Sequence, residues 1–294
     1  MNSACLQKAV TFDCEGDRLV GVLHLPQEAK DWGVITVVAG GPQYRAGCGR
    51  QLLLMGRELA AQGIPVMRFD QRGVGDSEGD FLGFHRMTEE YRAAVKAFKE
   101  HAPSVRHIAL WGGCDAAASA LIHGWKIDGI DGLMLANPFL TYPSSRANLQ
   151  RKHYLKRLGE RSFWKKVLTL QYNPLEYAGA LLGRPTAKPK SVTSPAGDGD
   201  QQLVHVPEDF GDHMLKGLNQ FQGQVLFVMS EHSPTRREFD EIIADHPGWG
   251  KAYRDCNAKR VDLPEADQTF STEGSRAAAS EAALEWLNLL CAKQ

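Results

Sequence analysis

The sequence predicts an α/β protein built on a mostly parallel, eight-stranded sheet with flanking helices. Three observations support this fold class. From residue 34 onward, short apolar segments alternate with amphipathic segments, as in repeated units of strand, helix and parallel strand. Residues typical of turns separate these segments. A turn of small residues at 112–116 joins an apolar strand directly to an alanine-rich helix.

The first half of the chain contains five of the expected strands. Two segments with alternating apolar residues predict an antiparallel hairpin. A continuous apolar run before Gly40 is typical of a strand buried on both faces. Apolar residues at helical spacing predict the helices, and Gly63 marks the end of the first one. We expect strands at 9–14, 18–25, 34–39, 65–70 and 107–111, and helices at 50–62 and 87–101.

The second half predicts three more strands and a large insertion. About 85 residues lie between the first two of these strands, too many for one loop of a compact domain. Basic amphipathic segments at 146–168 and a Pro- and Gly-containing stretch at 183–202 suggest helices and a linker. We expect strands at 132–137, 224–229 and 260–263 and helices at 238–244 and 275–290.

We interpret 140–222 as a helical lid inserted into a core formed by 1–139 and 223–294. The basic face of this insertion is most simply a solvated helix surface. It could instead bind an anionic substrate or a layer of lipid headgroups.

Composition excludes several classes of protein. The 294 residues carry a net charge of −1, so the protein has no overall positive charge that would attract nucleic acid. No apolar run is long enough to span a membrane, and the N-terminus lacks a signal-peptide pattern, so we expect a cytoplasmic protein. Six scattered cysteines without a C-x-x-C pair predict neither disulfides nor zinc. No G-x-G-x-x-G motif follows a strand, so we expect no metal and no cofactor.

The segment Gly112-Gly113-Cys114-Asp115-Ala116 is typical of a nucleophile elbow. In that turn the central residue is strained, and the residues two before and two after it are small so that strand and helix can approach. This pattern predicts an α/β-hydrolase fold with Cys114 as the nucleophile. The N-terminus of the following helix should lower the pKa of the thiol. The simpler interpretation is an inert packing cysteine.

A second loop, Gly40-Gly41-Pro42-Gln43-Tyr44-Arg45, lies where such hydrolases place an oxyanion-hole amide. Proline has no N–H, so the donor would be Gly41 or Gln43, and the second donor would be the amide of Asp115. Alternatively, the glycines serve only the geometry of a turn.

The chain resembles the exosortase A system-associated hydrolases, subtype one, of bacterial exopolysaccharide gene clusters. The resemblance extends over nearly the whole chain. It rests on five segments: 40–45, Arg68 to Gly79, Leu110 to Asp115, Asn137-Pro138 and Leu263 to Ser271. It implies a cysteine nucleophile at Cys114, a histidine base at the position of Gln268 and an acid near Ser233.

This sequence departs from the family at both the base and the acid. A glutamine amide has no useful basicity near neutral pH. One explanation is a thiol that attacks an activated acyl group without an ordinary triad. A second is a scaffold that binds a ligand without turnover. A third is that nearby groups have taken over the missing roles, with His232 first and Glu231, Asp267, His205 and His213 as further candidates.

We favour an enzyme whose Cys114 acts on a small-molecule acyl substrate, an ester or a thioester, free or carrier-linked. The reaction would be hydrolysis, acyl transfer or cyclisation. A reactive elbow cysteine would expose a protein that only binds ligands to oxidation, which argues against the binding alternative. The sequence contains no signal for an oligomeric state.

Overall fold

The computed structural model describes residues 5–38, 43–142, 207–256 and 258–292. The chain divides into two compact units, Met1–Leu140 together with Phe210–Gln294, and Thr141–Asp209. Residues 143–206 of the expected lid lie outside the described residues, so the lid remains a prediction. The 11-residue helix α7 (Phe210–Gln220), which falls within the expected insertion 140–222, belongs to the first unit.

The first unit contains one eight-stranded sheet with the order β1-β2-β4-β3-β5-β6-β7-β8. Strands β1 and β2 form the predicted hairpin, β2 runs antiparallel to β4, and the other neighbours are parallel. This confirms the predicted fold class. The strands are β1 (Leu6–Cys14), β2 (Asp17–Leu25), β3 (Trp32–Val37), β4 (Val66–Phe69), β5 (His107–Gly113), β6 (Ile130–Ala136), β7 (Gln224–Ser230) and β8 (Lys259–Leu263).

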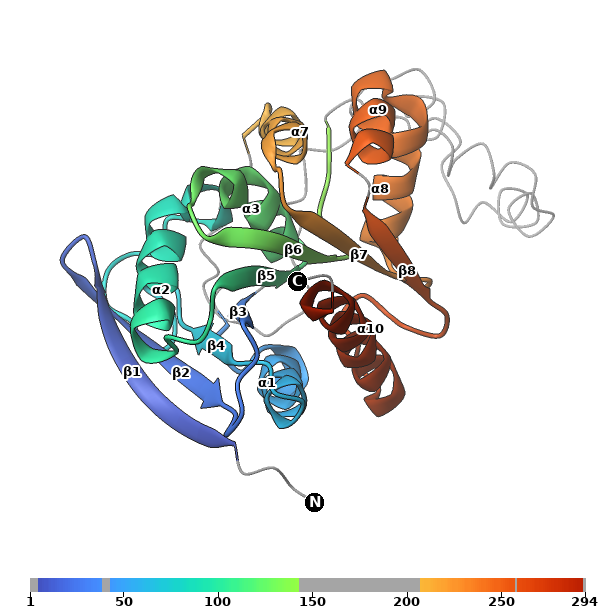
Figure 1. The fold of residues 1–294 in the computed structure, drawn as a ribbon. Helices are drawn as coiled ribbons and strands as arrows, with labels where there is room; N and C mark the ends of the chain where they lie inside the picture. Colours follow the sequence, from blue (N-terminus) through green and yellow to red (C-terminus); the bar gives the residue numbers. More distant parts are fainter. Residues whose placement is uncertain (1–4, 39–42, 143–206, 257, 293–294) are drawn as a thin grey trace, which may run out of the picture. The chain divides into compact units, whose positions relative to one another are not determined.

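Helices cover both faces of this sheet, with α1 and α10 on one face and α2, α3, α7, α8 and α9 on the other (Figure 1). Three one-turn 3-10 helices, Cys48–Arg50, Phe84–Arg86 and Gly124–Lys126, connect the larger elements. Besides α7, the helices among the described residues are α1 (Gln51–Ala61), α2 (Thr88–His101), α3 (Asp115–His123), α8 (Pro234–Asp245), α9 (Pro247–Asp255) and α10 (Glu273–Cys291).

Successive side chains of β7 point to opposite faces of the sheet and pack into two separate cores. Leu226 and Val228 are fully buried and pack in the cluster that α1 and α10 cover. Phe227 between them points to the opposite face, where its ring lies 5.4 Å from that of Phe239 on α8. Both faces of the central strands are therefore apolar, which explains why their sequences are continuous apolar runs.

Helix α9 has no counterpart in the sequence prediction. Pro247 is its first residue, and the imidazole of the preceding His246 accepts a hydrogen bond from the Trp249 backbone N–H at 3.3 Å. Proline at the first position and a side-chain cap before it are start signals for a helix. The helix itself contains two glycines, Gly248 and Gly250, and these weaken the helical pattern in the sequence.

Candidate active site

Cys114 lies in the turn between β5 and α3 with a φ of 51° and a ψ of −116°. Residues other than glycine rarely adopt this backbone conformation, because it is strained for any residue that has a side chain. The turn is held by its neighbours: the Cys114 N–H donates to the Ala136 carbonyl at 2.9 Å, and the Phe139 N–H donates to the Cys114 carbonyl at 3.0 Å. The structure therefore has the strained strand-turn-helix geometry that the motif predicts.

Gly112 permits the close approach of strand and helix. A β-carbon at Gly112 would lie 2.6 Å from the backbone carbonyl of Ala116, inside van der Waals contact. A β-carbon at the neighbouring Gly113 would meet nothing nearer than 3.9 Å. The first glycine is thus required by packing, whereas the second is not.

The thiol of Cys114 does not have the lowered pKa that the sequence suggests. Burial raises its pKa to about 12, and the adjacent Asp115 carboxylate adds to the increase. The Asp115 backbone N–H and the Gln268 side chain act in the opposite direction but do not compensate. Asp115 also accepts the Ala116 N–H at 2.9 Å, so this carboxylate occupies part of the helix N-terminus. The expected lowering of the thiol pKa is therefore wrong, because desolvation of the buried sulfur outweighs the hydrogen bond from the Asp115 amide.

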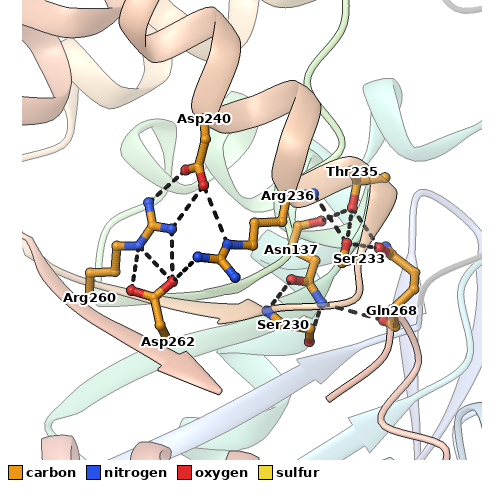
Figure 2. A network of polar contacts seen from close by, with 9 residues as sticks. All are labelled: Asn137, Ser230, Ser233, Thr235, Arg236, Asp240, Arg260, Asp262 and Gln268. Carbon is orange, nitrogen blue, oxygen red and sulfur yellow. Dashed lines mark hydrogen bonds and ion pairs between the residues drawn. The ribbon is translucent and has the colours of Figure 1, made fainter. Parts of the chain in front are cut away.

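Gln268 lies in the loop after β8, and its side chain reaches Cys114. Its amide oxygen accepts hydrogen bonds from the hydroxyls of Ser233 and Thr235, the latter at 2.7 Å (Figure 2). Its amide nitrogen is buried and finds no acceptor within ordinary hydrogen-bond geometry among the described residues. The same side chain lowers the pKa of the Cys114 thiol, which indicates that the amide lies near the sulfur. Gln268 therefore lies close to both Ser233 and Cys114.

Asn137 connects the segments that carry Ser233 and Gln268 (Figure 2). Its amide oxygen accepts the Ser230 N–H at 2.7 Å, and its amide nitrogen donates to the Ser230 hydroxyl at 2.8 Å and the Gln268 carbonyl at 3.5 Å. Its own carbonyl accepts from the Thr235 hydroxyl at 3.2 Å. Asn137 is fully buried and has a positive φ of 44°. It fixes the ends of β6 and β7 against the loop that contains Gln268.

The sequence reasoning missed the roles of Asn137 and Thr235. Asn137-Pro138 is one of the five segments on which the family resemblance rests, yet the segment does not show which groups the Asn137 amide would contact. For Thr235 the sequence indicates the place but not the role: Ser233-Pro234 is a helix-start signal, which puts Thr235 in the first turn of a helix.

The histidines proposed as substitute bases do not reach Cys114 in the described part of the chain. His232 follows β7, but its side chain is exposed and makes no hydrogen bond or ion pair within the described ranges. His213 is an exposed residue of α7. His205 lies outside the described residues.

The two acids proposed for the same role also lie elsewhere. Glu231 is exposed, and its backbone N–H donates to the Leu263 carbonyl. Asp267 accepts the backbone N–H groups of Thr269 and Ser271 at 3.1 and 2.9 Å, and these bonds help to lower the pKa of its carboxyl. Asp267 therefore shapes the loop that carries Gln268.

Of the predicted oxyanion-hole donors, the amide of Asp115 faces the Cys114 sulfur and lowers its pKa. Gln43 is partly buried, and no contact with Cys114 places it in the site. Gly41 lies outside the described residues, so Gly41 and Gln43 remain predictions. Within the described ranges, no group of three or more His, Cys, Asp or Glu side chains could hold a metal ion.

The sheet order, the strained elbow after β5 and the convergence of the loops after β7 and β8 on that elbow define an α/β-hydrolase fold. Residues 45–222 match the model of the Hydrolase_4 family, described as serine aminopeptidase, S33. This match covers more than half of the chain, and the chain belongs to this family.

Solved structures of α/β hydrolases are similar to this chain over nearly its whole length. The esterase Pf2001 of Pyrococcus furiosus has a TM-score of 0.63 and 14% identity, covering 97% of this chain and 91% of the other. Est1E of Butyrivibrio proteoclasticus, with ferulic acid bound, has a TM-score of 0.64 and 19% identity, covering 97% and 100%. The α/β hydrolase GrgF of Penicillium sp. sh18 has a TM-score of 0.60 and 15% identity, covering 98% of this chain and 99% of the other.

No curated protein sequence matches the chain. None of the helices that the structure describes is long and apolar enough to cross a membrane.

Proposed function

We propose that this protein is an acyl-transferring enzyme in which Cys114 attacks an ester or thioester and Gln268 occupies the place of the usual histidine. The observation that carries this proposal is the hydrogen bond from the Ser233 hydroxyl to the side-chain amide of Gln268, and the effect of that side chain on the pKa of the Cys114 thiol supports it. The elbow geometry and the membership of a hydrolase family support the same reaction class.

The two departures from an ordinary triad complement each other. In the usual arrangement, a carboxylate accepts a hydrogen bond from the histidine ring. An amide oxygen needs a donor instead, and the Ser233 hydroxyl supplies one. Hydrogen bonds in series polarise one another, so the bonds to the amide oxygen strengthen the amide N–H as a donor toward sulfur. Gln268 and Ser233 thus act as a donor pair, which stabilises negative charge but removes no proton.

This arrangement suits the acylation of a cysteine by an activated acyl group. Cys114 forms a bond to the acyl carbon, the bond to the leaving group breaks, and the thiol proton passes to that leaving group. The amide of Asp115 would stabilise the oxyanion, together with the amide of Gly41 or Gln43. A thiolate can leave without being protonated first, because the pKa of an ordinary thiol is only about 8.5, whereas an alkoxide is a much poorer leaving group, which favours a thioester over an unactivated ester.

Release of the acyl group requires an acceptor. Water would need a base, and no basic side chain contacts Cys114 within the described ranges. The acceptor would therefore be a better nucleophile than water, either a second molecule or a group within the acyl chain, so that transfer or cyclisation competes with hydrolysis. The substrate would be a small acyl compound, free or carrier-linked. The resemblance to the exosortase-associated subtype suggests a bacterial protein, and we propose that it acts in the cytoplasm.

The raised thiol pKa favours a second candidate, a protein that binds an acyl or hydrophobic ligand without turnover. Incubation with a short-chain thioester, followed by mass spectrometry of the intact protein and its peptides, separates the two. The proposed enzyme gains one acyl group on Cys114, and Cys114→Ala gains none at that peptide while keeping its fold. An unmodified Cys114 in a folded protein that still binds the thioester would favour the binding function.

A further inference from the structure

We infer that Thr235 is a positioning residue of this site: with Ser233, it holds the side-chain amide of Gln268 so that the amide nitrogen faces the Cys114 sulfur. The inference rests on the proposed function, because it assigns a role within the same site.

Thr235 is the second residue of α8, and its hydroxyl lies at the centre of the contacts around Gln268 (Figure 2). The Thr235 oxygen is 2.7 Å from the Gln268 amide oxygen, 2.9 Å from the Ser233 hydroxyl and 3.2 Å from the Asn137 carbonyl. A carbonyl oxygen has two lone pairs, and the two hydroxyls can occupy both. The oxygen end of the amide is then held from two sides, which leaves the nitrogen end for the sulfur.

The first turn of α8 is itself fixed in place. Ser233 caps the helix by accepting the Arg236 N–H at 3.1 Å, and Pro234 restricts the backbone between Ser233 and Thr235. The Arg236 guanidinium forms ion pairs with Asp262 at 2.9 Å and Asp240 at 3.3 Å.

Arg260 binds the same two carboxylates, Asp240 at 2.7 Å and Asp262 at 2.8 Å (Figure 2). These ion pairs join α8 to β8, the strand that leads into the Gln268 loop. Thr235 on α8 and the Gln268 loop after β8 are therefore held in a fixed relative position by these ion pairs.

A glutamine amide can also turn by half a rotation and exchange its nitrogen and oxygen. In the orientation inferred here, the N–H stabilises a thiolate. In the reverse orientation, the carbonyl would accept the S–H and stabilise the neutral thiol. Loss of the Thr235 hydroxyl would consequently slow the alkylation of Cys114 in the first case and accelerate it in the second, because the thiolate is the nucleophile.

The test is Thr235→Val, which removes the hydroxyl and keeps the shape of the side chain. Iodoacetamide alkylation of Cys114 is followed at pH 8 to 10 by peptide mass spectrometry. We expect the rate to fall about threefold or more, since a shift of one pKa unit changes the thiolate fraction about tenfold and a higher intrinsic nucleophilicity offsets part of that change. Thr235→Ser keeps the hydroxyl and should retain the rate of the unchanged protein.

Two further variants distinguish positioning from a general loss of structure. Thr272→Val removes the hydroxyl that caps α10 by accepting the Ser275 N–H at 3.1 Å; it should lower the unfolding temperature without changing the alkylation of Cys114. In a Gln268→Leu background, Thr235→Val should have no further effect on the alkylation rate, because the amide that it positions is gone.

An unchanged or faster rate in Thr235→Val, or an equal loss in Thr235→Ser, would overturn the inference. Alkylation needs no turnover, so this result is independent of the acylation experiment. A protein that never forms an acyl adduct on Cys114 would reject the proposed function even if Thr235→Val behaved as expected.

Discussion

The hydroxyl of Ser233 donates a hydrogen bond to the side-chain amide of Gln268, although 35 positions separate the two residues in the chain. Ser233 caps the helix that follows β7, and Gln268 lies in the loop that follows β8. These are the two places where an α/β hydrolase carries its acid and its base. In this chain a hydroxyl donor and an amide therefore stand at the two positions where the family resemblance implies an acid and a histidine.

The first prediction concerns the relative reactivity of the cysteines. Cys48 is exposed, whereas Cys114 is partly buried and has a pKa raised to about 12. At pH 7.5, iodoacetamide should modify Cys48 well before Cys114. The rate at Cys114 should then rise about tenfold per pH unit until the pH approaches the raised pKa, because the thiolate fraction grows by that factor. Peptide mass spectrometry at several time points measures both rates, and a faster Cys114 at neutral pH would mean that the thiol is ionised after all.

The second prediction concerns the elbow glycines. Gly112→Ala places a methyl group against the Ala116 carbonyl, so the strand and helix must separate. Overpacking of this kind costs about 1 to 3 kcal/mol, and backbone atoms cannot give way as a flexible side chain can. Gly113→Ala is the matched control, because its added methyl group meets nothing nearer than 3.9 Å. Chemical denaturation should show a lower free energy of unfolding for the first variant and little change for the second; equal losses would contradict the packing argument.

The third prediction concerns Glu90, a buried acid of α2 beside Arg72. Burial raises its pKa from 4.5 to about 7, although Arg72 acts against this increase. The folded state therefore holds the proton more tightly than the unfolded state does. This contribution to stability is complete below pH 4.5 and is lost as the pH rises from 4.5 to 7, by about 3 kcal/mol at most. Glu90→Gln should remove that part of the pH dependence, as measured by urea unfolding at a series of pH values. An unchanged pH profile would show that other groups produce it.

The sequence was sufficient for the fold because its signals are local and agree with one another. The apolar runs of β3 and β5 to β7, the hairpin of β1 and β2 and the elbow at Cys114 each follow from short-range patterns that the structure confirms. Helix α9 was missed because its two glycines weaken the periodic pattern.

The candidate site was predictable in its positions but not in its electrostatics. The motifs placed Gln268 and Ser233 opposite Cys114. The thiol pKa was predicted in the wrong direction, because desolvation depends on the atoms that surround the sulfur in the folded chain. For the same reason, no pattern in the sequence indicated that Thr235 and Asn137 would hold Gln268: their contacts join residues 33 and 131 positions apart.

The last prediction restores an ordinary triad. Gln268→His places an imidazole where the amide now faces Cys114, and Ser233→Asp supplies the carboxylate that orients it. General base catalysis contributes about 10² to 10⁴ in rate, so the double variant should hydrolyse a chromogenic ester measurably faster than the unchanged protein. Gln268→His alone should reach only the lower end of this range of rates, since Ser233 orients the ring poorly.

Ser233→Asp alone should be destabilised, because its carboxylate would be fully buried against the Gln268 amide oxygen, with two acceptors facing each other. The gain in rate of the double variant should therefore exceed the sum of the two single gains. Gln268→His should also offset part of the stability that Ser233→Asp loses. Steady-state hydrolysis and urea unfolding of the four proteins measure both couplings. If the double variant were no faster than the unchanged protein while remaining folded, the raised pKa of Cys114 would be a barrier that a base at position 268 cannot overcome.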